Sequence, residues 1–75
     1  MNTGDVIRIR HQDAIIPLRS GEDGLELDVE ADADNFITGT VVWREGYQVR
    51  LELEDGTIES GDIHDLINFR GLREI

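Results

Sequence analysis

The sequence predicts an all-β fold, a strongly curled antiparallel sheet or small barrel of about five or six strands. Apolar and polar residues alternate with a period of two in several short segments, as expected for strands with one buried face. Short turns rich in glycine separate these segments. The only helical spacing is one short turn at about 61–67, near the end of a chain of 75 residues.

The first predicted strand is Asp5 to Arg10, in which Ile7 and Ile9 alternate with arginines as in a half-buried strand. The next apolar segment, Ala14 to Leu18, contains Pro17. Because proline cannot donate a hydrogen bond to a sheet ladder, we expect this segment at an edge or a bend.

A third strand is predicted for Leu25 to Glu30, where leucine and valine alternate strictly with acidic residues. We expect Leu25, Leu27 and Val29 to point into the core and the acidic face to point to solvent. Polar loops are predicted on both sides of this strand, at residues 20–24 and 31–35.

The segment from Phe36 to Ser60 predicts a three-stranded antiparallel meander. Residues 44–46 match a three-residue loop with glycine last, which places Trp43 opposite Tyr47. Continuing along both strands pairs three further sets of residues on the core face: Val41 with Val49, Gly39 with Leu51, and Ile37 with Leu53.

The second turn of the meander is predicted as a two-residue loop of Asp55 and Gly56. This loop pairs Leu53 with Ile58, and it sets Glu52 beside Glu59 as a mildly destabilising pair of like charges. Gly39 lacks a side chain in the middle of a strand, which favours a bend that lets the sheet curl.

After Ser60, apolar residues at 63, 66 and 67 have the spacing of one helical turn, for which Ser60 or Asp62 could supply the N-cap. The tail from Phe69 to Ile75 predicts a last short strand. We expect it to pair with the first strand and so close the sheet.

Several segments together resemble small SH3-like barrels of the Tudor or KOW type: Gly4 to Ile9, Gly39 to Val42, Tyr47 to Leu51, and the Asp55-Gly56 turn. The resemblance implies one SH3-like β-barrel domain over residues 1–75, and binding of nucleic acid, peptide or ribosome components. The chain departs from this pattern between Ala14 and Asn35, which is longer than a simple first loop and carries an extra acidic strand.

The charge composition indicates a particular environment. Seventeen acidic residues face seven basic ones, all of them arginine, for a net charge of -10. A lysine-free acidic surface is typical of proteins from halophilic archaea; an acidic mesophilic protein or a viral nucleic-acid mimic is the alternative. The N-terminus lacks the pattern of a signal peptide, there is no cysteine, and no apolar stretch is long enough to cross a bilayer, so we expect a cytoplasmic location.

Three aromatic residues are candidates for a binding surface. Trp43 and Tyr47 flank the first hairpin tip and could form a platform for a peptide, a base or a methylated side chain, or else plug the end of the core. The predicted register turns Phe36 to the solvated face, where the segment from Ala14 to Leu18 could cover it.

An arginine patch is the alternative site. If the last strand pairs with the first, Arg8, Arg10, Arg70 and Arg73 could together face an anion or a nucleic acid. The competing interpretation is that they form salt bridges with neighbouring carboxylates.

We find no pattern for catalysis, a metal or a cofactor. His64 lies between Asp62 and Asp65, but neighbouring positions on one helical turn point in different directions, and His11 with Asp13 could complete a site only if the chain ends meet. We therefore expect a non-enzymatic binding or regulatory module whose partner is a protein or a second copy of the chain. A nucleic-acid-binding barrel is the alternative, and neither a membrane nor a small-molecule substrate is indicated.

The charge composition predicts that salt stabilises the fold. At 1 M salt the Debye length falls to about 3 Å, which screens most of the repulsion among the acidic residues. We expect the melting temperature, followed by circular dichroism, to rise markedly between low salt and molar KCl. A melting temperature indifferent to salt would contradict the halophilic interpretation.

Overall fold

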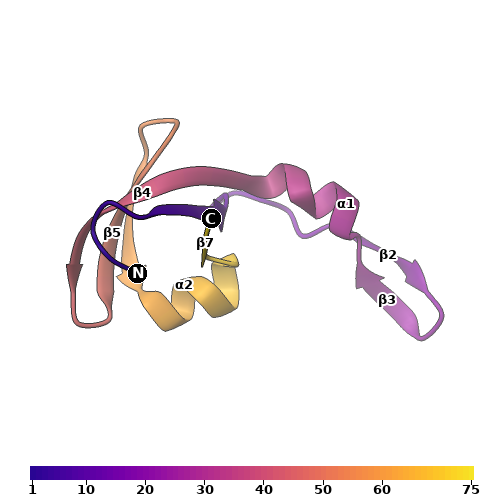
Figure 1. Ribbon diagram of the computed structural model, residues 1–75. Coiled ribbons are helices and arrows are strands. Elements are labelled where there is room, and N and C mark those ends of the chain that lie inside the picture. Colours follow the sequence, from indigo (N-terminus) through magenta and orange to yellow (C-terminus); the bar gives the residue numbers. More distant parts are fainter.

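The computed structural model describes residues 1–75 and is mostly β, which confirms the predicted fold class. A five-stranded antiparallel sheet has the strand order β6-β5-β4-β1-β7, and a separate two-stranded sheet is formed by β2 and β3 (Figure 1). The strands of the main sheet are β1 (Val6–Arg10), β4 (Phe36–Glu45), β5 (Gln48–Leu53), β6 (Ile58–Asp62) and β7 (Arg73–Glu74). The remaining elements are β2 (Leu18–Gly21), β3 (Gly24–Leu27), α1 (Val29–Asp32), a 3-10 turn (Ala33–Asn35) and α2 (Ile63–Arg70).

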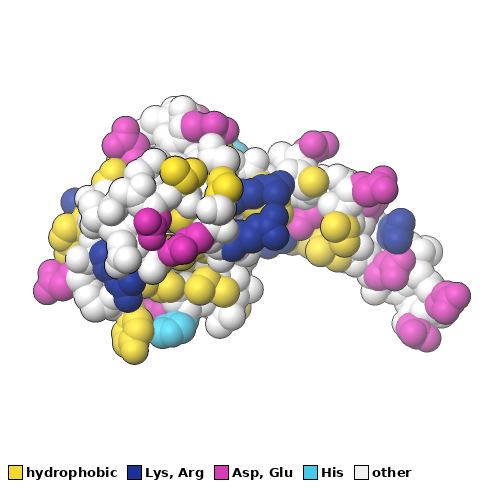
Figure 2. Space-filling view, viewed as in Figure 1, with side chains coloured by type: hydrophobic (Ala, Val, Ile, Leu, Met, Phe, Trp, Pro, Cys, Tyr) yellow, Lys and Arg dark blue, Asp and Glu magenta, His cyan; other side chains and the backbone are white.

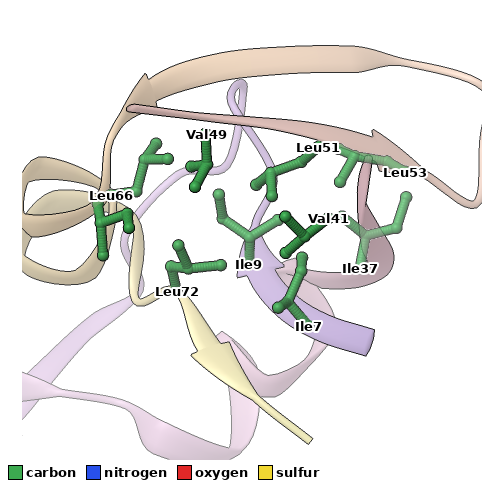
Figure 3. Packing of buried hydrophobic residues seen from close by; sticks show 10 residues of the cluster. Ile7, Ile9, Ile37, Val41, Val49, Leu51, Leu53, Leu66 and Leu72 are labelled. Carbon is green, nitrogen blue, oxygen red and sulfur yellow. The ribbon is translucent and has the colours of Figure 1, made fainter. Parts of the chain in front are cut away.

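The core lies on the concave face of the main sheet, where α2 and the chain leading to β7 cover it (Figure 3). Strict alternation in β1 and β5 places every second side chain in this layer, as predicted. The core contains ten buried residues: Ile7, Ile9, Ile37, Val41, Val49, Leu51, Leu53, Ile63, Leu66 and Leu72.

Helix α2 is longer than the predicted turn and begins at the predicted cap, because the Asp62 carboxylate accepts a hydrogen bond from the His64 amide at 2.8 Å. It ends at Gly71, whose φ of 62° is the left-handed conformation that glycine adopts without strain. The chain then turns into β7, which pairs with β1 as predicted. No helix of the structure has the length and apolar character needed to cross a membrane.

The register of the first hairpin differs from the prediction. Its loop has two residues, Gly46 and Tyr47, and only the glycine has a positive φ, which is the pattern of a type II′ turn. Trp43 therefore pairs with Arg50 and not with Tyr47. A bulge at Val42 shifts the register again, so that the core-face pairs are Val41 with Leu51 and Gly39 with Leu53.

The second hairpin has the longer loop that was predicted for the first. Its loop contains three residues and ends on Gly56, with a φ of 88°, while the Leu53 amide donates to the Thr57 carbonyl at 2.8 Å. The pair across the strands is Glu52 with Ile58, so the expected pairing of Glu52 with Glu59 was wrong. Glu59 instead lies opposite the buried Leu51.

Arg70 links two strands of the main sheet, β6 and β1, that do not pair with each other. Its guanidinium makes two hydrogen bonds to the Glu59 carboxylate, at 2.7 and 2.8 Å, and two to the Arg10 carbonyl, at 2.7 and 2.9 Å. One side chain of α2 thus connects β6 to the end of β1. The last strand pairs with the first as expected, but the sheet does not close into a barrel, because its two edge strands, β6 and β7, do not pair with each other.

The segment between β1 and β4 departs most from the prediction. Leu25, Leu27 and Val29 were expected in the core, but all three are exposed, and Val29 begins α1. The predicted polar loop at 31–35 is helical, and Ala14 to Pro17 form no strand. The hairpin β2–β3 projects away from the main sheet and gives the molecule a long dimension of 43 Å against 24 and 20 Å (Figure 1).

The close approach of β4 and β5 at Gly39 gives a testable consequence. A Cβ added there would lie 2.8 Å from the Glu52 carbonyl oxygen and 3.2 Å from the Leu53 Cα, so backbone would have to move. We expect Gly39→Ala to lower the free energy of unfolding by about 1–3 kcal/mol in chemical denaturation. Gly61→Ala is the matched control, because the atoms nearest to its Cβ would be side-chain atoms of Leu66 at 3.5 Å, an ordinary contact distance. Equal stability of the two variants would contradict this account.

Candidate interaction surfaces

The projecting hairpin of residues 18–27, called the arm below, has two different faces. Cross-strand pairing sets Leu18 opposite Leu27, and Ser20 opposite Leu25, on one face. On the other face, Arg19 donates to Glu26 at 3.0 Å. Leu18 is 57% exposed, Leu25 73% and Leu27 39%, so much of the leucine face is open to solvent.

Acidic residues surround the leucine face. Glu22 and Asp23 form the turn of the arm, and Asp28 and Glu30 follow at its base. Figure 2 shows acidic side chains along the arm. A hollow of about 720 Å³ at the turn is lined mostly by polar and acidic residues. The arm therefore combines an apolar centre with a negative rim.

The arm is anchored to the main sheet through Asp32, a buried residue of α1. Arg10 donates two hydrogen bonds to this carboxylate, at 3.1 and 2.6 Å, and Asn35 donates a third at 2.9 Å. These contacts hold the pKa of Asp32 below its usual value; the hydrogen bond from Arg10 has the largest effect and that from Asn35 the next largest. The same pair raises the pKa of Arg10. At the base of the insertion the His11 amide donates to the Asn35 carbonyl at 2.7 Å.

The predicted arginine patch is divided by ion pairs. Arg10 is paired with Asp32, and Arg70 is paired with Glu59. Arg8 and Arg73 are direct cross-strand partners on β1 and β7, and neither forms an ion pair. Two of the four arginines thus form ion pairs within the fold. The other two are adjacent cations without a carboxylate partner, although Arg8 donates to the Ala33 carbonyl at 3.2 Å.

Phe36 lies beside these arginines. The guanidiniums of Arg8 and Arg10 lie 4.6 and 5.0 Å from the centroid of its ring. Its ring also packs so closely on Gly71 that a Cβ there would lie 3.1 Å away. With Arg8 and Arg73, Phe36 lines a cavity of about 330 Å³. Figure 2 shows basic side chains gathered where the main sheet meets the arm.

Trp43 and Tyr47 do not form a joint platform, and neither plugs the core. Trp43 is 38% exposed and lies on the outer face, with the Arg50 guanidinium 5.5 Å from its ring centroid. Tyr47 is 62% exposed, and its ring lies 4.7 Å from that of His64. Each aromatic residue has its own neighbour, because the first hairpin has the shorter loop.

The histidines lie in separate places. The Asp62 carboxylate caps α2 and lies 3.3 Å from the Nδ1 atom of His64, whereas His11 lies 3.5 Å from Asp55. His11 and Asp13 therefore do not complete a cluster around His64. No group of three or more histidine, cysteine, aspartate or glutamate residues is placed to hold a metal ion.

Sequence reasoning missed the arm as a separate element. Leucines at 18, 25 and 27 on either side of a polar turn carry the signal of a hairpin, but nothing in that pattern tells a buried face from an uncovered one. The anchor was also missed, because Asp32 and Arg10 are 22 positions apart.

The depressed pKa of Asp32 predicts the pH dependence of stability. Because the folded-state pKa lies below the ordinary value of 3.8, the stabilisation is fully present above about pH 3.8 and is lost as the pH falls through the lower folded value. We expect Asp32→Asn to reduce the urea midpoint at pH 6 and to lose less stability than the parent protein on acidification. Asp34→Asn, at an exposed neighbouring position, is the control. Identical pH profiles for the two variants would argue against the anchor.

The comparisons with known proteins add no relative. Searches against protein-family models, curated proteins and solved structures found no match to this chain. The proposals below therefore rest on the residues and geometry of the chain itself.

Proposed function

We propose that the protein is a non-enzymatic binding module that docks a protein partner through the leucine face of the arm. The observation that carries this proposal is the position of three exposed leucines on one face of a hairpin that projects from the sheet. Monomeric proteins rarely keep such a face without a use.

The energetics of the hairpin support a partner. An isolated two-stranded hairpin is marginally stable in water and needs further strands or a packing surface. Burial of each leucine side chain of the arm by a partner would contribute about 2 kcal/mol. Both outer edges of β2 and β3 are also unpaired, so a partner strand could extend this small sheet.

The charge of the arm favours a partner of opposite sign. Its leucine face is bordered by Glu22, Asp23 and Asp28, and the whole chain carries a net charge of -10. Two arms brought together would repel each other at low ionic strength. We therefore assign the partner an apolar surface with a basic border, and not a second copy of this chain.

The acidic, lysine-free composition supports the cytoplasm of a halophilic archaeon as the place of this interaction. Nucleic-acid binding is less well supported. Its predicted surface required four free arginines, and ion pairs occupy Arg10 and Arg70. Two free cations would neutralise few phosphates, whereas non-specific affinity for nucleic acid depends on many.

A photo-crosslinking residue placed at Leu25 tests this proposal in the native cytoplasm. We expect one discrete protein adduct, and a basic segment of the partner in the crosslinked peptide. The same group at Ile58, a half-exposed residue on the edge strand β6, is the control. Equal adducts at both positions, or an adduct with a second copy of this chain or with nucleic acid, would contradict the assignment.

The purified partner then allows a quantitative measurement. We expect Leu25→Ser to weaken binding by about tenfold or more in calorimetry, because it removes an apolar contact, and Ile58→Ser to leave the affinity unchanged. The exposed position of Leu25 outside the core means that the variant should keep the melting temperature of the parent protein.

A further inference from the structure

The cavity between the main sheet and α1 carries the unpaired positive charge of the molecule. Four arginines have no carboxylate partner. Arg44 donates to the carbonyls of Gly46 and Met1, and Arg50 lies over Trp43. Arg8 donates to the Ala33 carbonyl at 3.2 Å and lies over Phe36, and the Arg73 side chain makes no hydrogen bond. Of the four, only Arg8 and Arg73 lie side by side, as cross-strand partners.

The two carboxylates beside this pair, those of Asp32 and Glu74, are engaged by other groups. Glu74, the neighbour of Arg73, forms an ion pair with the N-terminal amine at 3.1 Å. Asp32 borders the same cavity, but both of its oxygens accept hydrogen bonds from Arg10 and Asn35. Like charges directly opposite each other in a sheet are destabilising, so this pair costs stability that an anion would restore.

The cavity can hold a small group. Its volume is about 330 Å³, at the lower end of the range for ligand pockets. Arg8 and Arg73 supply its charge, and Val29, Ala33 and the Phe36 ring supply apolar walls. The other two cavities of the molecule are lined by glutamates and contain no arginine.

We infer that this cavity binds a carboxylate presented by a protein next to an aliphatic side chain. Guanidinium forks match the planar carboxylate and bind it with two parallel hydrogen bonds. The walls from Val29 and Ala33 provide an apolar contact for the adjoining aliphatic group. The carboxylate can come from a chain terminus or from an acidic side chain, and the chemistry is the same.

A nucleic acid fits the cavity less well. Arg8 and Arg10 already lie within 5.0 Å of the Phe36 centroid, so a base would have to displace a guanidinium in order to stack. Acidic side chains lie along the arm next to this basic region (Figure 2) and would repel a phosphate backbone that extended toward the arm. The site therefore favours one anionic group over a chain of phosphates.

This inference rests on the proposed function only in taking a protein as the source of the ligand, because its residues do not overlap with the leucine face. The two proposals can fail separately. Leu25→Ser should leave carboxylate binding unchanged, and removal of Arg8 and Arg73 should leave the leucine face intact.

The test follows the side-chain Nε–H resonances of the arginines by NMR during titration with three capped peptides. One is acetyl-Gly-Val-Leu with a free carboxylate, the second is its amide, and the third is acetyl-Val-Asp-Val amide. We expect the two peptides that carry a carboxylate to shift the Arg8 and Arg73 resonances. The amide of acetyl-Gly-Val-Leu should bind at least about tenfold more weakly than the free acid. The stronger of the two carboxylate peptides identifies the source of the group.

Matched variants separate a site from a general charge effect. Binding to the variants is followed through the backbone amide resonances of Ala33 and Gly71, which line the cavity. Arg8→Gln with Arg73→Gln should abolish these shifts, whereas Arg44→Gln with Arg50→Gln removes the same number of charges and should retain them. Amide spectra check that each variant is folded. Any of four results would overturn the inference. Two concern the peptides: equal binding of acid and amide, or no shift at Arg8 and Arg73. The other two are equal loss of binding in both double variants and tighter binding of a short 5′-phosphorylated single-stranded DNA.

Discussion

Arg10 is the residue on which both parts of the structure depend. Its carbonyl accepts two hydrogen bonds from Arg70, which also holds Glu59 on the opposite edge of the sheet. Its side chain turns the other way, donates to Asp32 and so attaches the arm. The curl of the sheet and the attachment of the arm therefore meet at one residue at the end of β1. A change in the backbone at this point would affect both.

The exclusive use of arginine explains how so few cations can organise an acidic chain. A guanidinium has five donors in a planar fork, so Arg70 can bind a carboxylate and a carbonyl at the same time. Lysine offers a compact, strongly hydrated charge that cannot span two such partners in one plane. Because Arg10 and Arg70 are largely shielded from solvent, salt screens their hydrogen-bonded pairs less than it screens the repulsion between surface carboxylates. High salt thus removes a cost without removing these contacts.

The sequence allowed the main sheet to be predicted in outline, but not its registers. Alternation in β1 and β5, the spacing of Ile63 and Leu66, and the pairing of the last strand with the first are local or nearly local signals, and the structure has them. Gly46 suits either the end of a three-residue loop or the start of a type II′ turn, and alternation cannot distinguish the two. The bulge at Val42 compensates for part of the difference and leaves no mark in the sequence.

The candidate surfaces were harder to predict, because they depend on which partner each charge finds. All four arginines of the predicted patch lie near one another in outline, yet Asp32 and Glu59 take two of them. Both carboxylates lie in segments that looked like solvated loop or solvated strand. The free pair of Arg8 and Arg73 becomes visible only after these ion pairs are known.

The arm lies apart from the residues that form the core of this chain. All ten core residues lie outside residues 11–35, so the insertion between β1 and β4 contributes no side chain to the core. The ladder between β1 and β4 continues as far as the pair of Arg10 and Phe36. The two ends of the segment between these strands therefore lie side by side, and the segment leaves the sheet intact. Neither the packing of the core nor the register of the main sheet requires leucine at these positions of the arm. Their exposure lowers the solubility of the protein. The partner that we propose would give those leucines a role that the fold does not.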